Sequence, residues 1–236
     1  MEEKAKYKRV LLKLSGEALQ AKDGIIDFDF LNKIAAVVKK ASDNGVSFAF
    51  VIGGGNIWRG AKGVEVERSR SDHMGMLATT INSLAFQDAL IKAGMDARVM
   101  TALDMQKIAE SYSQDRANRY LDKGKPVIIA CGTGNPYFST DTGAILRAAE
   151  LHADVALFAK NIDAVYDSDP KLNKDAKRFS SITYKELIDR GLKVIDVSAA
   201  AIAGEAKIKT LIFALKQPEN IYNAVMGKDI GTVITV

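Results

Sequence analysis

The chain has 236 residues, of which 47% are hydrophobic, so it can form one large domain or two small ones around a substantial core. Its 33 Lys and Arg against 29 Asp and Glu leave a net charge of +4, which is too mild for a nucleic-acid binder. The N-terminus, MEEKAKYK, is too charged for a secretion signal, and no stretch reaches the roughly 18 apolar residues of a membrane span. The single cysteine allows no internal disulfide. We therefore expect a cytoplasmic protein that binds neither membranes nor nucleic acids.

Short apolar runs alternate with helix-like runs along the chain. The predicted strands are Val10–Leu14, Val46–Ile52, Ala97–Thr101, Val127–Cys131, Val155–Ala159, Thr210–Leu215 and Thr232–Val236. The predicted helices are Phe28–Ser42, Ser71–Ala93, Asp115–Lys123, Thr142–Leu151, Thr183–Arg190 and Pro218–Met226. This alternation predicts an α/β fold in which a mostly parallel sheet has helices on both faces. The polar region Asp163–Ser181 is predicted to be a long loop, and the absence of a linker favours a single domain.

Three glycine-bearing turns each follow a predicted strand. They are KLSG from Lys13 to Gly16, GGGN from Gly53 to Asn56, and GTGNPYFSTD from Gly132 to Asp141. Turns of this kind present backbone N–H groups, and the last one also opens a helix whose positive end favours phosphate. In parallel sheets, ligands lie beyond the carboxyl ends of the strands, where all three turns fall. The sequence therefore predicts a site for more than one phosphate group.

The common nucleotide and hydrolase motifs do not match these turns. A P-loop would need Ser or Thr after Gly124-Lys125, but Pro126 follows. A dinucleotide fingerprint that begins at Gly53 would need glycine where Trp58 stands. The two histidines are far apart in sequence and the chain has no G-x-S-x-G, which argues against a histidine-rich metal site and a serine hydrolase.

The residues themselves resemble a known family. Lys13-Leu14-Ser15-Gly16, Gly53-Gly54-Gly55-Asn56 with Arg59, and D-x-V-Y-x-x-D-P at Asp163–Pro170 resemble the amino acid kinase family. DHMGMLAT at 72–79 and GTGNPYFSTD are similar to the bacterial uridylate (UMP) kinases, and the match runs from Arg9 to the C-terminus. The resemblance implies a three-layer sandwich with a central, mostly parallel sheet between helices. It also implies a homohexamer, a trimer of dimers, that transfers the terminal phosphoryl group of ATP to UMP with Mg²⁺ in pyrimidine nucleotide biosynthesis.

The resemblance further implies which residues form the site, without any metal ligand from the protein. The catalytic residues would be Lys13, Arg59 and Asp141, with Asp141 orienting Lys13. The ATP-binding residues would be Lys13, Leu14, Ser15, Gly16, Gly55, Arg59, Lys160 or Asn161, Tyr166 and Asp169, with Asp196 nearby. The UMP-binding residues would be Gly54, Asp72, Thr133, Gly134, Asn135, Pro136, Tyr137, Phe138, Ser139 and Thr140. The UMP-binding part would cover roughly residues 1–150, and the ATP-binding part roughly 151–236 plus the turn from Lys13 to Gly16.

Simpler structural roles compete with some of these assignments. Asp72 is also suited to cap a helix that begins near Met74, and Asp141 to cap one that begins at Thr142. Cys131 is predicted to be a small buried hydrophobic residue inside a strand.

The function has alternatives too. One is a kinase of the same family acting on carbamate or an acyl carboxylate, and another is a non-catalytic uridine-nucleotide sensor. Allosteric regulation is common in relatives, but the segment 21–26 is shorter than the loop associated with GTP activation, which predicts weak control by GTP.

Overall fold

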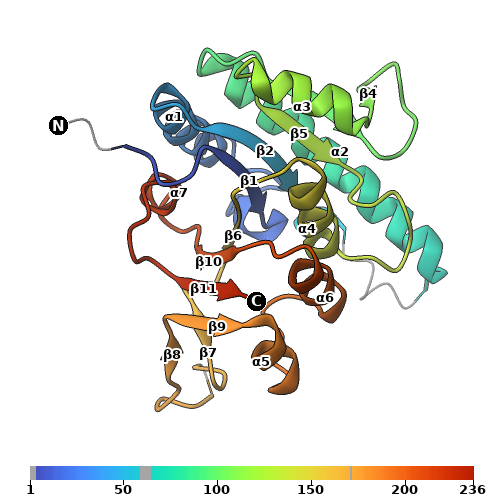
Figure 1. The fold of residues 1–236 in the computed structure, drawn as a ribbon. Helices are drawn as coiled ribbons and strands as arrows, with labels where there is room; N and C mark the ends of the chain where they lie inside the picture. The colour runs from blue at the N-terminus through green and yellow to red at the C-terminus, as the bar shows by residue number, and fades with distance from the viewer. Residues whose placement is uncertain (1–3, 59–64, 171) are drawn as a thin grey trace.

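The computed structural model describes residues 4–58, 65–170 and 172–236 (Figure 1). The strands of the main sheet are β1 (Arg9–Leu14), β2 (Ser47–Ile52), β3 (Arg98–Thr101), β4 (Glu110–Ser111), β5 (Val127–Ala130), β6 (Val155–Lys160), β9 (Ser181–Thr183), β10 (Thr210–Ala214) and β11 (Thr232–Thr235). The helices are η1 (Gly16–Leu19), α1 (Phe28–Asp43), α2 (Arg68–Lys92), α3 (Gln114–Asp122), α4 (Thr140–Glu150), α5 (Tyr184–Asp189), α6 (Val197–Glu205) and α7 (Glu219–Val225).

The strands form one nine-stranded sheet in the order β4-β3-β5-β2-β1-β6-β10-β11-β9. Strands β10 and β11 pair antiparallel, whereas the other neighbouring strands run parallel. The prediction of a mostly parallel sheet is therefore confirmed. Strand β1 lies inside the sheet, between β2 and β6, so the turn that follows it lies next to the ends of both neighbours.

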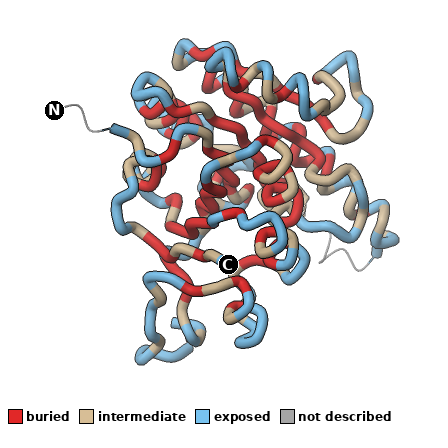
Figure 2. Tube along the Cα trace, in the orientation of Figure 1, coloured by how far each residue is buried: buried red, intermediate tan, exposed pale blue. Residues whose placement is uncertain are grey.

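Helices cover both faces of this sheet and make a three-layer sandwich. One hydrophobic core joins α1, α2 and α7 to the sheet, and the other joins α3, α4, α5 and α6 to its opposite face. In β1, Leu12 and Leu14 belong to the first core and Leu11 to the second, as the alternation of side chains along a strand requires. Lys13 follows Leu11 by two residues, so it shares the face that α4 covers. Figure 2 shows that the buried residues concentrate in the strands and on the inner sides of the helices.

Local signals in the sequence account for where several helices begin and end. Asp27 caps α1 by accepting a hydrogen bond from Phe30 N at 2.8 Å. Helix α1 ends before Gly45 and α2 before Gly94, and both glycines have positive φ, 83° and 85°. Glycine adopts this conformation without a steric penalty, so it can end a helix at these positions.

The structure corrects three expectations. The predicted loop Asp163–Ser181 contains the antiparallel pair β7 (Val165–Tyr166) and β8 (Arg178–Phe179). Helix α6 was not predicted, because its segment VSAAAIAGE has no clear polar and apolar faces. Cys131 is not inside a strand, since β5 ends at Ala130 and Cys131 is a buried residue with φ of 66°.

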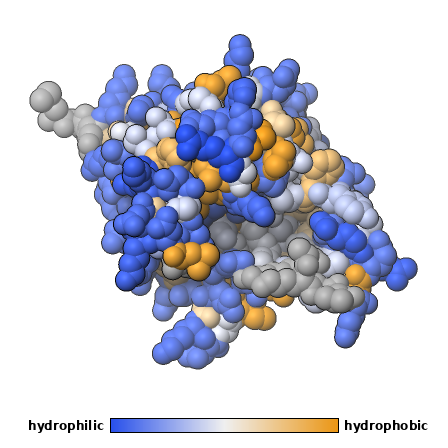
Figure 3. All heavy atoms as spheres, turned by 90° about the horizontal axis from the view of Figure 1, so that it is seen from below, coloured by the Kyte–Doolittle hydropathy of each residue, from blue (hydrophilic) through white to orange (hydrophobic). Residues whose placement is uncertain are grey.

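The face of the molecule in Figure 3 is largely hydrophilic, with smaller hydrophobic patches. Within the described part of the chain, no helix combines the length and the hydrophobicity that a membrane crossing demands.

Candidate active site

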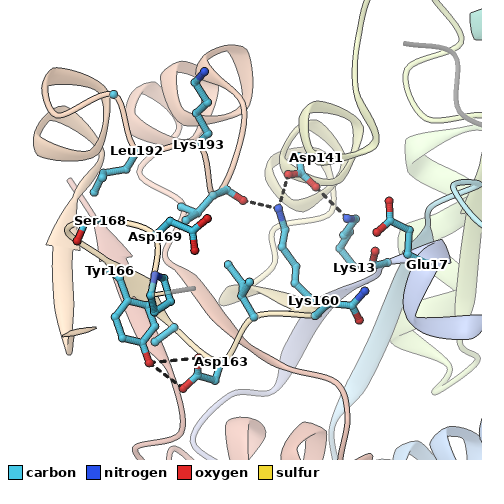
Figure 4. Close-up of a pocket in the computed structure, with 17 residues that line it drawn as sticks. Lys13, Glu17, Asp141, Lys160, Asp163, Tyr166, Ser168, Asp169, Leu192 and Lys193 are labelled. Atoms are coloured by element: carbon cyan, nitrogen blue, oxygen red, sulfur yellow. Dashed lines mark hydrogen bonds and ion pairs between the residues drawn. The ribbon is translucent and has the colours of Figure 1, made fainter. Parts of the chain in front are cut away.

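A first cavity, of about 620 Å³, opens at the carboxyl ends of β1 and β6 (Figure 4). We call it the donor cavity. Of the residues expected to bind ATP, six line it: Lys13, Ser15, Lys160, Asn161, Tyr166 and Asp169. The segment from Gly191 to Val194 closes another side. Leu14 and Gly16 are buried, and Arg59 lies outside the described residues.

A second cavity, of about 490 Å³, lies between the start of α2 and the turn that follows β5. We call it the acceptor cavity. Eight of the residues expected to bind UMP line it: Gly54, Asp72, Thr133, Asn135, Tyr137, Phe138, Ser139 and Thr140. Gly134 and Pro136 are not among its described lining residues. Gly55 lines this cavity, although it was expected on the ATP side.

An ion cluster of two lysines and one aspartate lies between the two cavities. Lys13 Nζ is 3.0 Å from Asp141 Oδ1, and Lys160 Nζ is 2.6 Å from Asp141 Oδ2. In Figure 4 both lysines point toward Asp141, and Lys160 also donates a hydrogen bond to the carbonyl of Val194. The space beside the cluster is lined by Ser139 as well, which also lines the acceptor cavity. The cluster therefore lines the donor cavity and lies beside residues that also line the acceptor cavity.

The strand and helix that carry this cluster explain its geometry. Lys13 is on β1 and only 7% exposed, whereas Lys160 is the last residue of the neighbouring β6. Asp141 is in the first turn of α4, where the helix N-terminus favours a carboxylate. The alternative that Asp141 caps this helix is wrong, because Ser139 is the cap and its hydroxyl accepts from Thr142 N at 3.1 Å.

Burial and the neighbouring charges shift the pKa values of Asp141 and Lys160 in this cluster. Burial works against ionisation of Asp141, but the two ammonium groups hold the pKa of this carboxyl below its usual value. Burial lowers the pKa of Lys160, and the charge of Lys13 adds to this effect while Asp141 opposes it. Two lysines thus share the carboxylate of Asp141 in a buried place, and the carboxylate of Asp196 also acts on Lys160. A pair of buried ammonium groups is suited to contact anionic phosphate groups.

Asp72 connects α2 to the turn beyond β5. Its Oδ2 accepts a hydrogen bond from Tyr137 N at 2.8 Å and one from Arg68 Nε at 2.9 Å. The expected alternative, a helix cap, is wrong, because α2 begins at Arg68 and Glu67 caps it. Asp72 is therefore held as a lining residue of the acceptor cavity by groups from two elements.

Asp196 lines more than one cavity. It was expected near the adenosine part of ATP, and it lines both the acceptor cavity and the space beside Lys13, Asp141 and Lys160. Its carboxylate caps α6 through Ala199 N, accepts from Thr142 Oγ1 at 2.9 Å and accepts a hydrogen bond from Ser139. The sequence signal for this role was the N-cap pattern of Asp196 before VSAA, which a search for helix starts would have found.

The glycine turns after β1 and β2 pack against each other through their backbones. A Cβ on Gly16 would be 2.4 Å from Gly53 O, and a Cβ on Gly54 would be 2.8 Å from Ala78 Cβ. No side chain larger than hydrogen fits at either position without movement of the backbone. The turn after β1 therefore packs on the turn after β2, and the latter packs on α2.

Comparison with known proteins identifies the family of this fold and site. The profile of the amino acid kinase family matches residues 8–214. The chain belongs to the amino acid kinase family. Within this family it is similar to the crystal structure of UMP kinase from Bacillus anthracis, with 36% identity, a TM-score of 0.93, and coverage of 97% of this chain and 96% of that one.

Two further solved structures extend the comparison. UMP kinase from Ureaplasma parvum is 36% identical with a TM-score of 0.92, and 97% of this chain matches 99% of that one. Uridylate kinase from Archaeoglobus fulgidus is 28% identical with a TM-score of 0.75, and 96% of this chain matches 99% of that one.

Proposed function

We propose that this protein is a UMP kinase, which transfers the terminal phosphoryl group of ATP to UMP and releases ADP and UDP. The observation that carries the proposal is the Lys13–Asp141–Lys160 cluster between two cavities, in a chain similar to UMP kinases over nearly its whole length. Two adjacent cavities suit direct transfer between two bound nucleotides. The alternatives, a kinase for carbamate or an acyl carboxylate and a nucleotide sensor, have no observation in their favour.

ATP would occupy the donor cavity and UMP the acceptor cavity. In this arrangement Tyr166 and Asp169 contact the adenosine part of ATP, and the turn from Lys13 to Gly16 faces its phosphates. Asp72 binds the ribose of UMP, and the segment 133–140 surrounds its base and phosphate. The acceptor part would then correspond roughly to residues 1–150, and the donor part to residues 151–236 with the Lys13 turn.

The chemistry needs cations more than it needs a base. The accepting oxygen belongs to a phosphate that is already ionised near neutral pH, so no group has to remove a proton from it. The obstacle is the repulsion between two polyanions and the charge that spreads over the transferred phosphoryl group. Lys13 and Lys160 supply positive charge at this point. Asp141 would hold both ammonium groups in place, and Arg59, which lies outside the described residues, would add a further cation.

Mg²⁺ would enter this reaction with ATP. Among the described residues, no group of three or more His, Cys, Asp or Glu side chains is arranged to hold a metal ion. Both carboxylate oxygens of Asp141 are engaged by lysines. Mg²⁺ commonly keeps several waters and binds substrate phosphates, and it would neutralise part of their charge. The residues present thus fit an ion carried by the nucleotide.

Self-association as a hexamer, a trimer of dimers, completes the proposal. Met74, Leu77 and Ile81 on α2 are 39%, 51% and 51% exposed. Their spacing places them on one face of the helix, and exposed apolar stripes of this kind mark protein interaction sites. This stripe supports assembly between copies of the chain through α2.

The regulation by GTP that some relatives show would be weak here. Asn56 Nδ2 donates to Ile25 O at 2.9 Å, so the short segment before α1 is tied to the turn after β2. We expect GTP to change the initial velocity by less than about twofold, which is a small coupling free energy.

One assay tests the function and the choice of acceptor together. ADP release would be measured with UMP, dUMP, CMP, dTMP, carbamate and glutamate, with UDP identified as the product. We expect UMP to be preferred over dUMP, because the loss of a charge-assisted hydrogen bond to Asp72 costs roughly 1.5–3 kcal/mol. Asp72→Asn should reduce this preference. ADP release with carbamate or glutamate but not with UMP would contradict the proposal.

A further inference from the structure

A buried arginine contacts the turn that follows β5. Arg147 on α4 is 6% exposed, and it is absent from the described residues that line the donor and acceptor cavities. Its Nη2 donates a hydrogen bond to Gly132 O at 3.1 Å, and its Nη1 donates to Glu150 Oε2 at 2.7 Å. The guanidinium carbon lies 4.0 Å from the centre of the Tyr112 ring. Tyr112 in turn donates its hydroxyl to Glu150 Oε2 at 2.6 Å.

The turn that Arg147 contacts has an unfavourable backbone conformation. Cys131 and Gly132 have φ values of 66° and 55°, and the left-handed region is costly for a residue with a Cβ. Neighbouring elements must therefore hold this turn in place. Cys131 N donates to Thr79 Oγ1 on α2 at 2.8 Å, and a Cβ on Gly143 of α4 would be 3.0 Å from Gly132 Cα.

Stability alone does not explain an arginine at this position. Apolar side chains of similar volume often replace buried ion pairs without loss of stability. Arg147 has instead a planar group that reaches Glu150 and Gly132 at once, which lysine or an apolar residue cannot reproduce. Burial and the hydrogen bond to Glu150 raise the pKa of Tyr112, so its hydroxyl keeps the proton that it donates. The contact with Gly132 O is the one that leads to the acceptor cavity, which Gly132 and Thr133 line.

We propose that Arg147 is a positioning residue, which holds the carbonyl of Gly132 and thereby places the segment 132–140 for binding of UMP. The inference rests on the proposed function, because the proposed function assigns UMP to the acceptor cavity. Arg147 acts through the turn and contacts neither nucleotide. Its loss should therefore weaken the interaction with UMP more than that with ATP.

Steady-state kinetics of Arg147→Met separate this role from a general structural one. We expect the KM for UMP to rise by about tenfold, in line with the loss of a hydrogen bond to a charged group, while the KM for ATP changes by less than about twofold. Arg147→Lys keeps the charge but cannot hold both partners, so it should show the same selective rise. Calorimetric titration of UMP without ATP should show the same weakening.

Arg98 provides the matched control. It also forms an ion pair with an aspartate, Asp96, and lies over a tyrosine ring, Tyr120, but it has no described contact with the turn after β5. Arg98→Met should leave the KM for UMP unchanged. An unchanged KM for UMP in both Arg147 variants, or an equal rise in the KM for UMP and ATP, would overturn the inference. Failure of the proposed function is distinguishable, because the wild-type protein would then form no UDP.

Discussion

At the scale of single residues, Lys13 shows how the site depends on a buried charge. Lysine is rarely buried to this extent unless it is paired, and here its partner is Asp141 at 3.0 Å. Asp141 has a second cation at 2.6 Å, Lys160. Removal of Lys13 would therefore leave no unpaired carboxylate in the interior. This makes Lys13 a residue whose function can be tested without loss of the fold.

We predict that Lys13→Met lowers kcat by about 100-fold or more, because the ammonium stabilises charge that grows during phosphoryl transfer. UMP should still bind, since Lys13 lines the donor cavity and not the acceptor cavity. The measurement is kcat at saturating ATP and UMP, with Lys39→Met as the control, because Lys39 forms an exposed ion pair with Asp43 on α1. A variant that keeps more than half of the wild-type kcat would refute this role.

The lowered pKa of Lys160 predicts a pH dependence. Its proton should be lost below the ordinary value of 10.5, because burial destabilises the charged form. As the pH rises toward 10.5, the cluster loses the positive charge of Lys160, so kcat/KM for ATP should fall. Lys160→Arg would keep the charge at all accessible pH values and should remove most of this alkaline decline. Identical profiles for the wild type and Lys160→Arg would show that another group titrates.

Residues that line the two cavities were predictable where a motif identified them. Lys13 lies in KLSG and Asp72 in DHMGMLAT, and each of these short segments matches the family at several consecutive positions. The contact of Lys160 with Asp141 could not be read from the sequence, because it depends on how β6 and α4 lie relative to each other in space. The contacts of Asp196 with Thr142 and Ser139 could not be read from the sequence for a related reason, since they depend on the packing of α6 against α4.

At the scale of elements, contact between the glycine turns limits substitution. We predict that Gly16→Ala lowers both stability and kcat/KM for ATP, because its Cβ would lie 2.4 Å from Gly53 O and push the two turns apart. The control is Gly24→Ala, whose Cβ would meet only Ala21 Cβ, at an ordinary 3.5 Å. The measurements are Tm and kcat/KM for ATP of the two variants, each compared with the wild type. Equal effects at the two positions would contradict the packing argument.

Elements with strong periodicity were predictable, and short or uniform ones were not. The strands β1, β2 and β6 are apolar runs of six residues and agree with the predictions to within one residue at either end. The pair β7 and β8 has two residues in each strand, too few for a pattern to emerge. Helix α6 is nearly uniform in hydrophobicity, so no face distinguishes it as a helix.

At the scale of the whole molecule, the apolar stripe on α2 predicts assembly. We expect Leu77→Lys to yield a smaller particle than the wild type in sedimentation velocity, because a charge in an apolar contact is costly to bury. The control is Ile25→Lys, since Ile25 is similarly exposed at 57% but lies outside α2. A wild-type particle that sediments as a single 25.6 kDa chain would contradict the proposed hexamer.

The central place of β1 in the sheet affects how the chain folds during translation. This strand leaves the ribosome before both of its neighbours. Strand β2 follows soon after, but the other neighbour, β6, is synthesised only when residues 155–160 are added. Until then one edge of β1 has no partner, and unpaired edges favour aggregation of nascent chains. A chain released before residue 155 would carry the segment 132–140 but lack Lys160. Premature termination therefore yields a product without the second ammonium group, so we expect the capacity for phosphoryl transfer to arise only late in translation.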